Sequence, residues 1–143
     1  MPTSNTAHNS IRTKFSKLDL ENVFAIVSMA RKGVKPKIFY DFANAINTSE
    51  KVLASMLNLS ARTISNYHDL NKTLESIQSE HLLKLIALYA KGEQLFGTID
   101  EFNYWLQKPF TASEERPVDW LVTPGGVDLI MAELDRLAHG YAV

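Results

Sequence analysis

The sequence contains no cysteine, so it can form neither a disulfide nor a thiolate metal site. It has no apolar run near the roughly 20 residues that cross a bilayer. Its first ten residues also lack the apolar centre of a signal peptide. The 143 residues are 45% hydrophobic and 22% charged, which is typical of a soluble globular chain. These features predict a cytoplasmic protein with no membrane partner.

The residue patterns of catalysis are missing as well. The histidines His8, His68, His81 and His139 are scattered, whereas a zinc site needs clustered histidines or cysteines. The sequence has no Gly-x-Ser-x-Gly elbow and no phosphate-binding glycine loop with its lysine. Residues 123–126, Thr-Pro-Gly-Gly, can hold an anion at a helix N-terminus, but a plain capped helix start explains them more simply. We therefore expect no enzyme activity, no cofactor and no metal.

Apolar residues recur at helical spacing along the chain, and strict two-residue alternation is nearly absent. This pattern predicts an all-α protein of about seven helices, whose ends are set by glycine, proline and capping residues. The recurring apolar positions include Val23, Phe24, Val27, Ile77 and Leu137. The expected helices cover residues 19–33, 36–47, 50–57, 60–69, 74–96, 98–109 and 123–140, after a flexible tail over residues 1–15.

Charge divides the chain into two unlike halves. Residues 1–72 hold ten Lys/Arg against five Asp/Glu, and residues 73–143 hold five against eleven. A basic half suits a polyanion, because Lys and Arg that neutralise phosphates release bound counterions. An acidic half is repelled by DNA and suits a different, basic partner. The alternative explanation is that charge fluctuates between the halves of any short protein.

Residues 52–69 carry the sharpest local pattern, that of a helix-turn-helix. Such a motif packs two short helices at a steep angle, so its apolar residues fall at fixed offsets. Asn58 occupies the turn position that is often glycine, and it tolerates the left-handed conformation better than most residues. The apolar and small residues that match the buried offsets are Leu53, Ala54, Leu57, Leu59, Ile64 and Tyr67.

The second helix of this motif presents a polar face suited to DNA. Arg62 can read a guanine edge or bind a phosphate, and Asn66 can read adenine, with Ser65 beside them. Ser60 and Thr63 lie at the helix N-terminus, where backbone N–H groups favour phosphate. The alternative is a helix pair that uses the same geometry purely for packing.

From about residue 30 to residue 140 the chain resembles the Xre/MbcA/ParS-type antitoxins. No single element of the resemblance is specific, but the order and spacing of the elements are. The matching positions are Arg31 and Gly33; Leu59 to Ile64; Glu75-Ser76 before Leu82-Leu83-Lys84-Leu85; Phe96-Gly97; Trp105-Leu106 with Pro109; and Pro117, Leu121, Thr123, Gly126, Leu134, Arg136 and Gly140.

The resemblance implies an antitoxin that pairs with a RES-domain toxin, a class of toxins that act on NAD. It also implies a homodimer with two functional parts. Residues 16–73 would form a helix-turn-helix domain that represses the protein's own operon, and residues 74–143 would form a toxin-binding domain that keeps NAD from the toxin's active site. Two features depart from the family pattern: Ser65-Asn66 stand where arginines are common, and residues 110–116 lack a usual glycine.

The C-terminus offers a cation, an imidazole and a flat aromatic ring in Arg136, His139 and Tyr141, with Gly140 among them. The resemblance implies that these residues enter the toxin site as a plug, whereas an ordinary helix terminus also explains them, because Arg136 and His139 suit the helix dipole. Trp120 is a further toxin-contact candidate, as either a core or an interface anchor. Three hypotheses follow: an antitoxin that also binds its operator, a neutraliser with a vestigial helix-turn-helix, and a transcription factor whose acidic half only dimerises.

Overall fold

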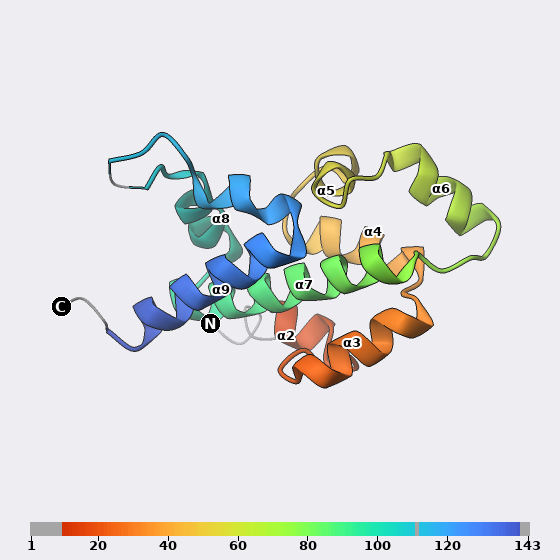
Figure 1. Ribbon diagram of the computed structural model, residues 1–143, viewed down its shortest axis with the longest axis horizontal. Coiled ribbons are helices and arrows are strands. Elements are labelled where there is room, and N and C mark those ends of the chain that lie inside the picture. Colours follow the sequence, from red (N-terminus) through yellow and green to blue (C-terminus); the bar gives the residue numbers. More distant parts are fainter. Residues whose placement is uncertain (1–9, 111, 141–143) are drawn as a thin grey trace, which may run out of the picture.

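The computed structural model describes residues 10–110 and 112–140, and every regular element within these ranges is a helix (Figure 1). The all-α prediction is confirmed. In chain order the elements are α2 (Ile11–Lys14), α3 (Val23–Lys32), α4 (Pro36–Ala45), α5 (Glu50–Met56), α6 (Ala61–Asp69), α7 (Ser76–Phe96), α8 (Ile99–Gln107), the 3-10 helix η1 (Pro117–Val122) and α9 (Pro124–Ala138). No helix in the described ranges has the length and apolar character needed to span a bilayer.

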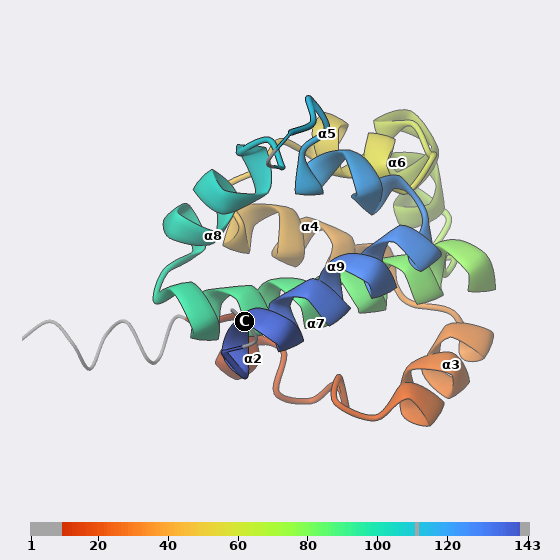
Figure 2. The same cartoon turned by 60° about the vertical axis from the view of Figure 1, so that its left-hand side comes forward.

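Helix α7 runs through the middle of the molecule (Figures 1 and 2). Helices α2 and α3 cover one side of it, α4 and α8 lie on the opposite side, and α9 lies beside it. Eleven of its 21 residues are buried, and they point around most of its circumference. A helix that is apolar on nearly all sides is stable only inside a protein, so α7 forms the core on which the other elements pack.

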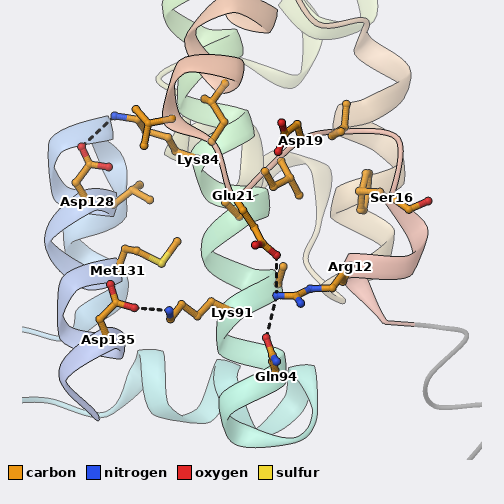
Figure 3. Close-up of a pocket in the computed structure, with 18 residues that line it drawn as sticks. Arg12, Ser16, Asp19, Glu21, Lys84, Lys91, Gln94, Asp128, Met131 and Asp135 are labelled. Atoms are coloured by element: carbon orange, nitrogen blue, oxygen red, sulfur yellow. Dashed lines mark hydrogen bonds and ion pairs between the residues drawn. The ribbon is translucent and has the colours of Figure 1, made fainter. Parts of the chain in front are cut away.

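Helices α7 and α9 are parallel and are joined by two ion pairs along their length. Lys84 Nζ lies 3.0 Å from Asp128 Oδ2, and Lys91 pairs with Asp135 one heptad later on both helices. Figure 3 shows both pairs bridging the two helices. Because each aspartate follows its lysine by the same number of residues, the two helices keep one register throughout their contact.

A buried serine fixes the connection between α3 and α4 against α7. The Val34 N–H donates to Ser79 Oγ at 2.9 Å, and this hydroxyl donates in turn to the Leu74 carbonyl at 3.2 Å. The Leu74 N–H completes this hydrogen-bond network by donating to the Val34 carbonyl at 2.8 Å. Buried polar groups need such partners, so Ser79 holds the residues that precede the helix-turn-helix segment in one position.

Two helices were absent from the sequence-based prediction, α2 and η1. The expected flexible tail over residues 1–15 is wrong from residue 10 onwards, because Ile11 and Phe15 are buried in the core. The Ile11 N–H also donates to Glu93 Oε1 of α7 at 2.8 Å. Both helices span at most two turns, too short to produce a recognisable apolar period. Residues 1–9 lie outside the described part.

Several apolar residues expected at helical spacing do not face the core. Val23 and Phe24 of α3, Ile77 of α7 and Leu137 of α9 are exposed, Phe24 to 82%. The helix expected from residue 19 is α3, and it begins later, at Val23. Asn22 caps it by accepting from the Ala25 N–H at 3.2 Å. Each exposed residue is part of an apolar period, but nothing in the described chain covers it.

Gly92 lies where α8 crosses α7. A methyl group built on it would come within 2.5 Å of the Phe102 ring. This ring is fully buried and packs on Tyr89, Phe96 and Trp105. The sequence indicated only a weak helix position at Gly92, whereas the structure shows that it allows the aromatic cluster to approach the α7 backbone.

We expect Gly92→Ala to lower the free energy of unfolding by about 1–3 kcal/mol, because the buried ring has no room to retreat. Urea denaturation measures the change. Gly125→Ala is the control, since nothing lies within 4 Å of a methyl group at that position of α9; its stability should stay the same or rise slightly. Equal stability of the Gly92 variant and the parent would show that Phe102 is not fixed as described.

Candidate nucleic-acid and protein interfaces

The α5–α6 segment has the packing that its sequence predicted. Leu53, Ala54, Leu57 and Ile64 are buried, and Leu59 and Tyr67 pack on the core from partly buried positions. Asn58 has φ = 60°, the left-handed conformation expected at the turn. The arrangement is consistent with a helix-turn-helix.

Ser60 begins α6 by accepting the Thr63 N–H on its Oγ at 3.0 Å, and the two hydroxyls lie 2.9 Å apart. These side chains are therefore already used in capping. Arg62, Ser65 and Asn66 are exposed on the outer face of α6. The five candidate DNA-binding residues thus share the first two turns of one helix, but whether they contact DNA remains a prediction.

Basic residues flank the C-terminal side of this helix pair. Arg31, Lys32 and Lys35 lie around the α3–α4 turn, and Lys72 follows α6. The turn and the α6–α7 connection are in contact, because a methyl group on Gly33 would meet Thr73. The α3–α4 turn with Lys35 therefore lies beside the residues that follow α6, including Lys72, whereas Arg31 and Lys32 line the outer face of α3.

The candidate toxin-binding residues lie at two ends of α9. Trp120 is on η1, before the start of α9, and it is 39% exposed. Arg136, His139 and Gly140 lie at the other end, Arg136 about 18 Å from the start of α9 at 1.5 Å per residue. The structure therefore does not gather them into one cluster; Tyr141 is outside the described residues.

The C-terminal turn of α9 is internally bonded. His139 Nδ1 lies 2.7 Å from the Asp135 carbonyl, and Arg136 Nη2 lies 3.4 Å from Glu133 Oε1. Both interactions are those of a capped helix end, as the simpler of the two sequence interpretations expects. The proposed plug remains a prediction.

Exposed apolar side chains on η1 and α9 form a surface that the sequence analysis missed. Val122, Leu129 and Leu137 are each between 44% and 57% exposed. Val127, Ile130 and Leu134 of the same helix are buried, so Leu129 lies on the side away from the core, whereas Leu137 continues the stripe of Ile130 at the exposed end of the helix. Leu129 falls outside the apolar period of α9, and this departure was the signal in the sequence that could have predicted its exposure. Exposed apolar groups in such number mark a binding surface.

The position of η1 is set from both of its ends. At its start the Asp119 carboxylate accepts from the Arg116 side chain at 3.0 Å, and this hydrogen bond lowers the Asp119 pKa. At its end the Leu121 carbonyl lies 2.8 Å from His81 Nε2 on α7. A methyl group on Gly126 would lie 1.7 Å from the Trp120 carbonyl, so η1 and α9 touch through their backbones. The tryptophan is therefore displayed on a rigid element.

A groove of about 810 Å³ separates α9 from the α2–α3 side of the molecule, with α7 as its floor (Figure 3). Its charged residues are largely paired: Arg12 bonds Gln94 and pairs with Glu21, beside the two lysine–aspartate pairs of α7 and α9. Among the described residues, no three His, Cys, Asp or Glu side chains come together as metal ligands. The groove thus offers few unpaired charges to a ligand.

Two comparisons show which known proteins this chain is similar to. Residues 91–140 match the model of the Xre/MbcA/ParS antitoxin C-terminal toxin-binding domain. The chain is also 27% identical over 124 residues to the "Prs ADP-ribosylating antitoxin" of Sphingobium sp. (strain YBL2). This alignment covers 80% of this chain and 78% of that relative. Both comparisons support the resemblance to the Xre/MbcA/ParS-type antitoxins that the sequence predicted, and the matched domain implies a toxin as partner.

The buried His81 makes the attachment of η1 sensitive to pH. Burial lowers its pKa most, the nearby Lys84 lowers it further, and the bond to Leu121 works in the opposite direction. An unfolded histidine titrates near pH 6.5. Because the folded pKa lies below that value, this contribution to stability is complete above about pH 6.5 and falls as pH drops towards the folded pKa.

We therefore expect the parent chain to lose more stability than His81→Gln between pH 7.5 and 5.5, because glutamine has no proton to take up. Urea denaturation at each pH gives the two slopes. Equal slopes would mean that another group carries the pH dependence. The glutamine variant is expected to be less stable than the parent at pH 7.5, so the comparison rests on slopes and not on absolute values.

Proposed function

We propose that this antitoxin neutralises a RES-domain toxin that acts on NAD, by laying its η1–α9 surface over the toxin's active site. The observation that carries the proposal is that four large apolar side chains, Trp120, Val122, Leu129 and Leu137, are exposed within the part that matches the toxin-binding domain. Aromatic and aliphatic anchors at the centre of an interface supply most of its binding energy. The antitoxin itself acts by binding and not by catalysis.

The curated relative supports the choice of an NAD-acting toxin. The name of the Sphingobium protein refers to ADP-ribosylation, and ADP-ribose groups are transferred from NAD. A toxin with an NAD site needs an inhibitor that blocks that site, and a rigid apolar surface with a protruding tryptophan can do so by shape. Arg136, His139, Gly140 and Tyr141 would lie at the edge of this contact as the C-terminal plug.

We further propose that α6 binds operator DNA and that the antitoxin does so as a homodimer in the cytoplasm, repressing its own operon. The support is the exposed face of α6 with Arg62, Ser65 and Asn66, together with the basic residues around the α3–α4 turn. Two-fold symmetric proteins match the two half-sites of an operator. The polar and basic surface fits DNA, and the apolar surface of α9 fits protein.

Leu129→Glu tests the toxin contact. We expect it to weaken the complex with a RES-domain toxin at least tenfold, about 1.4 kcal/mol, and to restore growth arrest on co-expression. The change places a charge in a desolvated interface while leaving the fold intact, because the side chain is 57% exposed. Leu70→Glu is the matched control: this leucine is 67% exposed but lies outside the matched region.

Calorimetry or size-exclusion chromatography of the mixed proteins measures the affinity. If the parent and the RES-domain protein elute separately at micromolar concentration, the proposed neutralisation is wrong. If they form a complex that Leu129→Glu leaves unchanged, the surface is assigned wrongly.

Arg62→Ala tests the DNA contact. Loss of one bidentate base contact should reduce operator affinity by about 1–3 kcal/mol, read by fluorescence anisotropy on DNA from upstream of the gene. Arg136→Ala removes the same charge from the far end of α9 and should leave operator binding unchanged. If the parent protein binds upstream DNA no more tightly than random DNA, the operator-binding proposal is wrong and the protein acts only as a toxin neutraliser.

A further inference from the structure

Helix α3 presents the most exposed large apolar side chain of the described residues. Ile26 and Ala30 bury one side of α3 against α7, and the opposite side carries Phe24, 82% exposed, with Val23 and Val27 beside it. A phenylalanine left in water loses the favourable free energy that burial of its ring would give. A patch of three such residues on one turn indicates that another surface covers it.

The outer face of α3 is apolar at its start and cationic at its end. Phe24, Val27, Ser28, Arg31 and Lys32 line a hollow of about 450 Å³ along it. Phe24 and Arg31 are two turns apart and therefore on the same stripe, with the small Ser28 between them. The helix contains no acidic residue at all.

We propose that this face joins two copies of the chain, with the two α3 helices antiparallel about a two-fold axis near Val27 and Ser28. The inference rests on the homodimer part of the proposed function and supplies its contact surface. In this arrangement each Phe24 ring enters the hollow of the other copy and lies over the partner's Arg31. A guanidinium over an aromatic face is attracted to it, more strongly when both are removed from water.

The antiparallel direction follows from the distribution of charge. A parallel pair would place the two Arg31 side chains against each other and the two Phe24 rings against each other, so that the cations repel. The antiparallel pair instead brings each cation to an aromatic ring and opposes the two helix dipoles. About this axis residue 24 of one copy faces residue 31 of the other and residue 27 faces residue 28, which keeps one stripe in contact along two turns.

Other occupants fit this surface less well. DNA offers phosphates to Arg31 and Lys32 but nothing to Val23 and Phe24. The toxin-binding match begins at residue 91, well after α3 in the chain. In Figures 1 and 2 α3 lies across α7 from α8, which is part of the matched region. A second copy of the chain supplies both groups that this face needs, an apolar aromatic ring and a cation.

The test begins with the oligomeric state of the full chain, without toxin or DNA, by sedimentation. We expect a dimer at micromolar concentration. Phe24→Lys should raise its dissociation constant at least tenfold, because the lysine meets the partner's Arg31, and Phe24→Lys with Arg31→Glu should restore dimers. Leu129→Lys is the control and should remain dimeric, since that leucine is also exposed but lies on α9.

Cross-linking distinguishes the direction of the helices, because the chain has no cysteine of its own. Val27→Cys should form a disulfide-linked dimer, since the two copies of this position nearly coincide along the axis. Phe24→Cys should not, because its copies would lie roughly 10 Å apart along the axis, beyond disulfide reach.

A monomeric parent, a dimer indifferent to Phe24→Lys, or cross-linking at Phe24 in place of Val27 would overturn the proposal. None of these outcomes depends on whether the chain neutralises a toxin. Circular dichroism of each variant checks that the substitutions, all at exposed positions, leave the helices formed.

Discussion

The burial of α7 is the constraint on which the rest of this structure depends. Its apolar residues point in nearly all directions, so the helix is stable only when other elements surround it. The two polar side chains buried on it are both committed to backbone groups of other segments: Ser79 bonds the α3–α4 turn, and His81 bonds the end of η1. The interior of α7 thus fixes the two segments that lead to the two candidate interfaces.

This arrangement joins the proposed DNA-binding and toxin-binding parts through shared packing. The Asn58 side chain at the α5–α6 turn donates to the Val122 carbonyl of η1 at 3.1 Å, so the two surfaces also touch directly. The buried apolar residues form one cluster from Ile11 to Leu134. Because a single core melts cooperatively, substitutions inside α7 weaken both surfaces together, and only exposed residues can separate the two activities.

The sequence predicted the long helices well, because their ends are set by local chemistry. Thr98 and Thr123 cap α8 and α9 through their own hydroxyls, as capping residues do wherever they occur. It failed for α2 and η1, which depend on tertiary contacts. It also failed to predict which apolar residues are exposed: a period of 3.6 identifies a helix and its stripe, but Phe24 and Leu129 differ from Ile26 and Ile130 only in what covers them.

The same distinction separates the two candidate surfaces. The α6 face was predictable residue by residue, because buried offsets leave the intervening positions exposed. The candidate toxin surface could not be predicted in this way. The sequence offered Trp120 and the C-terminal residues together as candidates, but they lie at opposite ends of α9. The two exposed apolar surfaces differ in their neighbours. Cations flank Phe24 on α3, whereas Asp128 and Glu133 lie close to Leu129 in the sequence of α9. An apolar surface with acidic neighbours attracts a basic protein, and one with cations and an aromatic ring at heptad spacing matches a copy of itself.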